Sequence, residues 1–276
     1  MDSTELAAYI GPGALAYRVL GPTADLLGDE LRAWTERRLR NLGNIFSTLE
    51  HKYGSGGIEG LDEGAISPRV LRGILDEGSY IEDEVGTEYY GGVLAGSRTV
   101  DGRNDSAVAL IEVMNTLSSP QLRAHFLIYA AAQQSLACSE RFDPLAPYEA
   151  PDGGWRRVAV PRSAFEAAIA ASGVAPSEDS ISSVMRGLRR TELIHAVGGW
   201  LTAEPAELQT TEFNAKWPCA ALVCTISNFG IELFCAAHGF TSIRDFNRPA
   251  ADFRARFRAG VSVVEPIVMQ DLPPAD

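Results

Sequence analysis

Gly21 to Tyr53 reads GPTADLLGDELRAWTERRLRNLGNIFSTLEHKY, and this stretch decides the architecture of the chain. Its apolar residues recur in steps of three and four, a spacing that predicts one long amphipathic helix. These residues are Leu20, Ala24, Leu27, Leu31, Trp34, Leu39, Leu42, Ile45 or Phe46, and Leu49. We expect Thr23 to cap the helix and Gly54 to end it. Such a stripe needs several covering elements, so the N-terminal half is predicted to be helical, with Trp34 as a core anchor.

The pattern changes after a segment rich in proline and glycine, FDPLAPYEAPDGGW at 142–155. Helical periodicity precedes it, from Ser67-Pro68 to about residue 140, and short apolar strands alternate with helices after it. We expect strands at 158–160, 193–197 and 221–225, helices at 178–191 and 228–237, and a tight turn at Gly198-Gly199. The order of these elements is that of a winged-helix domain, with residues 182–197 as a recognition helix leading into a wing.

The predicted fold class is therefore mainly α, with an N-terminal helical domain followed by a small α+β winged-helix-like domain. The expected divisions are an N-terminal arm at 1–20, the helical domain at 21–140, the winged-helix-like domain at 156–240 and an arginine-rich tail at 241–276.

The charge and hydropathy of the chain argue against two classes of function, nucleic-acid binding over a large basic face and membrane spanning. The chain has 36 acidic and 24 basic residues, a net charge of −12, which argues against one large basic face for nucleic acid. No apolar run approaches the roughly 18 residues needed to span a membrane, and acidic Asp2 and Glu5 stand where a signal peptide would be basic. We therefore expect a cytoplasmic protein.

Four cysteines allow one metal hypothesis. Cys219, Cys224 and Cys235 could join His238 in a zinc site, but they form no short Cys-x-x-Cys pair, and their neighbours are apolar. Buried free thiols are the favoured interpretation. We predict no metal and no cofactor, since the glycine-rich 54–64 stretch also lacks the Lys-Ser/Thr of a phosphate loop.

Short motifs distributed over residues 20–240 resemble the abortive infection alpha family, bacterial proteins associated with phage defence. The matching motifs are Leu26-Leu27-Gly28-Asp29, Leu31-Arg32, Trp34, Arg37 or Arg38, Asn41-Leu42, Ile66-Ser67-Pro68-Arg69-Val70-Leu71, Ile74-Leu75-Asp76-Glu77, Ser79 to Glu84, Leu117-Ser118-Ser119-Pro120, Leu188 with Leu193-Ile194, and Thr225 with Phe229-Gly230 and Leu233-Phe234. Tyr89-Tyr90-Gly91-Gly92 departs from the family's Trp-Ala-x-Leu-Leu segment. The resemblance implies a role in phage defence and carries over no catalytic residue.

Neither the histidines nor any serine or cysteine falls in a recognisable nucleophile motif, so we predict a non-enzymatic protein without catalytic residues. The first hypothesis is a phage-defence protein that acts as sensor or effector through a protein partner or self-association. The alternative is a winged-helix regulator that binds duplex DNA. The candidate binding residues are Arg37, Arg38, Arg186, Arg189 and Arg190.

The predicted recognition helix decides between the two hypotheses. In DNA-reading winged helices its N-terminal part enters the major groove, but here that part begins with Glu178 and Asp179. The three arginines fall in its last turns, where they also complement the helix dipole. We therefore expect this domain to serve packing or dimerisation, and the arginines to contact phosphates only under the alternative.

Overall fold

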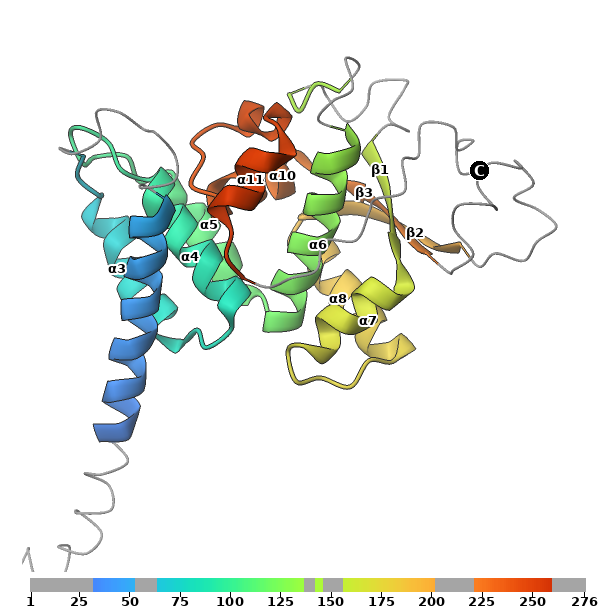
Figure 1. Cartoon of the computed structure of the whole chain (residues 1–276), viewed down its shortest axis with the longest axis horizontal. Helices are drawn as coiled ribbons and strands as arrows, with labels where there is room; N and C mark the ends of the chain where they lie inside the picture. Colours follow the sequence, from blue (N-terminus) through green and yellow to red (C-terminus); the bar gives the residue numbers. More distant parts are fainter. Residues whose placement is uncertain (1–31, 53–63, 137–141, 146–155, 202–220, 260–276) are drawn as a thin grey trace, which may run out of the picture.

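The computed structural model describes residues 32–52, 64–136, 142–145, 156–201 and 221–259. Within these residues the chain forms nine α-helices and a small three-stranded antiparallel sheet in its C-terminal half, which confirms the mainly helical prediction (Figure 1). After the helix 32–52 the elements are α3 (Pro68–Glu77), η1 (Gly78–Tyr80), α4 (Glu84–Gly96), α5 (Ala107–Thr116), α6 (Ser119–Leu136), β1 (Arg157–Pro161), α7 (Arg162–Ala170), α8 (Glu178–Arg190), β2 (Ile194–Leu201), β3 (Ala221–Ile226), α10 (Asn228–Ala237), η3 (Ile243–Asn247) and α11 (Ala250–Arg256).

Helix α6 is the centre of the fold. It packs against α4 and α10 on one side and against α7, α8, β1 and β3 on the other. Figure 1 shows it between the group formed by α3, α4 and α5 and the sheet. Neighbouring elements cover α6 on many sides, and twelve of its 18 residues are buried. A helix without a broad solvent-facing side is expected to be apolar around most of its circumference. One core cluster accordingly runs from Ile45 to Phe253.

Glycines in α4 allow two other helices to approach its backbone. A Cβ atom at Gly92 would lie 1.9 Å from the carbonyl oxygen of Ala237 at the end of α10. A Cβ atom at Gly91 would lie 2.6 Å from the side chain of Thr48 on the helix 32–52. Gly91 and Gly92 are thus small residues at the points where α4 is held between two helices.

The sheet has the order β1-β3-β2, with β3 antiparallel to both neighbours. All six residues of β3 are buried, as expected for a central strand that is covered on both faces. The tight turn predicted at Gly198-Gly199 is wrong, because β2 continues through these residues to Leu201. Its pairing with β3 shifts register between Val197 and Trp200, and paired glycines inside a strand commonly mark such an irregularity.

The helix 32–52 packs on the body along a face that overlaps the predicted stripe only in part. Ile45 of that stripe is fully buried, and Phe46 and Leu49 pack against the core. The other buried positions of the helix are polar, namely Asn41, Thr48 and Lys52. The prediction of Trp34 as a core anchor is wrong, because its side chain is 42% exposed, and Leu39 is 64% exposed. Periodicity therefore located the helix and the apolar part of its buried face, but it missed the buried polar residues, because their partners lie on elements distant in sequence.

The predicted arm at 1–20, residues 21–31 and the predicted boundary segment at 146–155 lie outside the described residues. The domain boundaries therefore stay predictions. Within the predicted tail, residues 243–256 form η3 and α11.

Candidate interaction surfaces

The candidate residue Arg38 lies beside two exposed aromatic side chains, those of Trp34 and Tyr80. The Arg38 guanidinium carbon is 4.7 Å from the ring centroid of Trp34 and 4.3 Å from that of Tyr80. The two rings themselves are 6.4 Å apart and tilted by 57°. We call Trp34, Arg38 and Tyr80 the aromatic–arginine cluster. The helix 32–52 supplies the first two residues, and η1 supplies the third.

The C-terminal end of α3 and the 3-10 helix η1 hold the guanidinium of Arg38 in place. Its Nε donates to Ser79 Oγ at 2.8 Å, and one of its Nη atoms donates to the carbonyl oxygen of Asp76 at 3.3 Å. One turn further along the same helix, Asn41 donates to the carbonyl oxygen of Ser79 at 2.9 Å. These bonds fix η1 against the helix 32–52 and thereby set the separation of the two rings. Arg37 adds only an exposed ion pair with Glu82 at 3.6 Å, which contributes little to stability.

The candidate residues on α8 form a second surface. Ile181, Val184, Met185 and Leu188 bury one face of this helix, so the opposite face points to solvent. Arg186, Arg189 and Arg190 are all exposed there, and none makes a hydrogen bond or ion pair within the described part of the chain. We call these three residues the α8 arginine face.

Local interactions fix the start of α8 and partly neutralise its negative charge. Ser177 and Ser180 form a reciprocal capping box, with Ser180 N donating to Ser177 Oγ at 3.1 Å. Glu178 is paired with Arg162 from the start of α7. Asp179 remains exposed, so the acidic start that the sequence suggested is only partly neutralised.

The two surfaces are separate. Figure 1 shows the helix 32–52 beside α3, at the opposite side of the view from α7 and α8. Arg37 and Arg38 therefore belong to a different part of the fold from Arg186, Arg189 and Arg190 on α8.

Sequence reasoning missed a buried ion pair beneath the helix 32–52. Lys52 Nζ lies 2.5 Å from Glu88 Oε2 on α4 and donates to the carbonyl oxygen of Arg256 at 2.7 Å. Burial lowers the pKa of Lys52, and the attraction of Glu88 opposes that shift only in part. No local pattern signals this pair, since its members are distant in sequence, and it joins three elements rather than forming a reactive site.

A second buried polar group ties the sheet to α6. The Tyr129 hydroxyl donates to the carbonyl oxygen of Leu193 and accepts from the Ser227 backbone N–H at 3.0 Å. Gly230 lies against this hydroxyl, since a Cβ atom there would come within 1.9 Å of it. The neighbouring His125 is fully buried, with its Nδ1 at 2.5 Å from the Tyr89 hydroxyl. These contacts give His125, Tyr129 and Gly230 roles within the core.

Two of the three cysteines considered for a zinc site are within the described residues, and both are buried thiols. Burial raises the pKa of Cys224 to about 12 and raises that of Cys235 as well. Cys219 lies outside the described residues. Over the part of the chain that is described, no three His, Cys, Asp or Glu side chains gather in a way that could hold a metal ion.

Among the described helices, none combines the length and the apolar character needed to cross a membrane. Comparison of the chain with protein-family models, with curated proteins and with solved structures finds no match.

Proposed function

We propose that this chain is a non-enzymatic bacterial phage-defence protein that acts through protein contacts at the aromatic–arginine cluster. The observation that carries the proposal is the contact of the half-buried Arg38 guanidinium with the faces of two exposed rings, Trp34 and Tyr80. Tryptophan, tyrosine and arginine are the side chains that most often dominate the binding energy of protein interfaces. The phage-defence setting rests on the ordered motifs that resemble the abortive infection alpha family.

The exposed fractions of the large apolar and aromatic side chains support a partner site at the aromatic–arginine cluster. Large apolar or aromatic side chains that stay exposed among the described residues are Trp34, Leu39, Leu75, Tyr80, Val100, Leu145 and Val174. Four of these seven belong to the helix 32–52, α3 or η1, so exposed apolar side chains are concentrated on the elements that form or adjoin the cluster. Such concentration on a globular protein favours a binding surface over scattered exposure.

Preorganisation of the cluster strengthens the same argument. Arg38 already bonds to Ser79 and to the Asp76 carbonyl, so a partner would not have to order this long side chain on binding. Ordering a side chain rich in rotamers costs about 0.5–1.5 kcal/mol in an interface. A partner can therefore gain contact area on both rings at a low entropic cost.

A plaque assay tests the proposal. A bacterium that expresses the chain should resist at least one phage in a panel, and Trp34→Ala with Tyr80→Ala should abolish that resistance. Val100→Ala is the matched control, because Val100 is 82% exposed and lies outside the cluster. Full resistance from the double variant, or no resistance from the wild type, would contradict the proposal.

A second candidate function is duplex DNA binding through α8. Two observations favour it: the order of helices and strands from β1 to β3, with the antiparallel sheet order β1-β3-β2, is compatible with the winged-helix-like domain expected from the sequence, and the α8 arginine face is exposed. Three exposed guanidinium groups on one helix face can each contact a DNA phosphate. Exposed Asp179 opposes deep entry of the helix start into a groove, which is why protein contact is our first proposal.

Fluorescence anisotropy with a labelled duplex separates the two functions. DNA binding would weaken steeply with salt and would be lost when Arg186, Arg189 and Arg190 are changed to Glu. Changing exposed Arg40, Arg72 and Arg103 to Glu gives a control of equal charge change. Our first proposal expects no salt-sensitive binding at physiological salt, and tight binding that depends on the α8 arginine face would establish the second.

A further inference from the structure

A cavity of about 330 Å³ lies between α6, α10 and α11, apart from both surfaces described above. Phe126 from α6, Phe234 from α10 and Phe253 from α11 line it, and Phe257 follows at the end of α11. The rings are ordered against one another: Phe126 stacks on Phe257 at 4.1 Å and Phe234 stacks on Phe253 at 5.3 Å. The cavity therefore has flat aromatic walls and a volume at the lower end of small-molecule sites, about 300–1,000 Å³.

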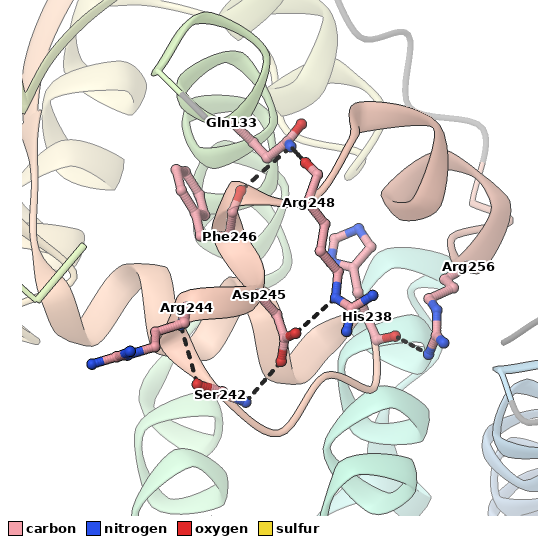
Figure 2. A network of polar contacts seen from close by, with 8 residues as sticks. All are labelled: Gln133, His238, Ser242, Arg244, Asp245, Phe246, Arg248 and Arg256. Atoms are coloured by element: carbon pink, nitrogen blue, oxygen red, sulfur yellow. Dashed lines mark hydrogen bonds and ion pairs between the residues drawn. The ribbon is translucent and has the colours of Figure 1, made fainter. Parts of the chain in front are cut away.

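Backbone anchors hold the segment that forms one side of this cavity. Gln133 Nε2 on α6 donates to the carbonyl oxygens of Arg248 at 2.7 Å and Phe246 at 3.4 Å (Figure 2). Asp245 accepts from Arg248 Nε at 2.7 Å and from the Ser242 backbone N–H at 3.1 Å. Through these bonds η3 and the start of α11 are fixed to α6, so the cavity is part of the folded structure.

His238 gives the cavity a hydrogen-bond acceptor. Its Nδ1 lies 2.7 Å from the carbonyl oxygen of Phe234, and because a carbonyl only accepts, Nδ1 must carry the proton. Nε2 is then the acceptor of a neutral ring, and it makes no hydrogen bond to any residue that the structure describes. Burial, with the positive charge of Lys52 adding to it, lowers the pKa of His238 well below 6.5 and keeps the ring neutral.

Arg254 gives the cavity a positive charge at its edge. It is among the lining residues, it is exposed, and it makes no ion pair within the described part of the chain. An apolar interior with aromatic rings, an imidazole acceptor among the lining residues and a cation at the edge together define the kind of molecule that would fit.

We propose that this cavity binds a small planar aromatic molecule that carries an N–H or O–H donor and an anionic group. The ring system packs among the four phenylalanines in the stacked and edge-on geometries that aromatic pairs favour. The donor bonds to Nε2 of His238, and the anionic group meets Arg254. This inference does not depend on the protein-contact proposal.

Indole-3-acetate is the probe, titrated into the full chain by calorimetry. Saturable one-to-one binding is expected. Binding should be about tenfold weaker for naphthalene-1-acetate, which lacks the N–H donor, and for indole, which lacks the carboxylate. Equal affinity for all three compounds, or no saturable binding of indole-3-acetate, would overturn the proposal.

Matched variants locate the binding. Ala250 lines the cavity from the start of α11, so Ala250→Trp should fill it and abolish binding, whereas exposed Ala251→Trp on the same helix should not. Arg254→Glu should weaken binding at least tenfold, while Arg258→Glu, an equal charge change outside the lining, should leave it unchanged. Circular dichroism confirms that each variant is folded, and binding that survives Ala250→Trp would place the probe elsewhere and contradict the assignment.

Discussion

At the scale of single residues, two glycines show how space in the fold decides the effect of one methyl group. Gly230 lies against the Tyr129 hydroxyl and the Leu193 carbonyl, where a Cβ atom would meet atoms at 1.9 and 2.4 Å. Gly230→Ala should therefore lower the free energy of unfolding by about 1–3 kcal/mol, the usual loss when a core is overpacked. Gly43→Ala should raise it by up to about 1 kcal/mol, since a Cβ atom there meets open space in a helix. Urea unfolding of both variants checks the opposite signs.

Two buried histidines predict a loss of stability in mild acid. Burial lowers the pKa of His125 to about 3 and that of His238 well below 6.5. Below about pH 6.5 the unfolded chain binds protons at these residues while the folded protein does not, so the free energy of unfolding falls as the pH falls. Between pH 7.5 and 5 the expected loss is about 2 kcal/mol for each imidazole. Urea unfolding across this range should show it, with about half the slope in His125→Gln, and a flat profile would refute the assignment.

At the scale of elements, the sequence predicted where helices and strands occur better than how they face one another. The sequence predicted a helix at 178–191, which is α8, and short apolar strands at 158–160 and 221–225, which are β1 and β3. The helix 32–52 shows the limit, because Asn41 and Lys52 are buried by partners 38 and 36 residues away and no local pattern reveals that. For the same reason, the sequence identified Arg38 as a candidate but could not place Trp34 and Tyr80 beside it.

The buried pair of Lys52 and Glu88 predicts strong coupling between the helix 32–52 and α4. Glu88→Ala would leave an ammonium group whose side chain is 0% exposed without its carboxylate. Breaking a buried pair from one side costs about 3–5 kcal/mol, whereas replacing both members by apolar residues costs far less. Urea unfolding of Glu88→Ala and of Lys52→Met with Glu88→Leu measures the difference, and equal loss in the two variants would contradict the buried pair.

At the scale of the whole molecule, α10 connects the two halves that the sequence divided. It packs against α4 from the N-terminal half and against α6, and Gly92 brings the α4 backbone directly onto the end of α10. We predict a single cooperative unfolding transition, observed at the same denaturant concentration by near- and far-ultraviolet circular dichroism. Two separate transitions would show that the halves are stable independently of each other.

Site-specific photocrosslinking tests whether the aromatic–arginine cluster contacts a protein in the cell. Tyr80 is replaced by p-benzoylphenylalanine, which preserves an aromatic ring at a position that is 57% exposed, and Val100 is replaced in the same way as the control. Cells that express either protein are irradiated during phage infection. If the cluster contacts a protein, a discrete crosslinked product forms at position 80 and is absent at position 100. No crosslink from position 80 in cells that resist the phage, or the same products from both positions, would contradict it.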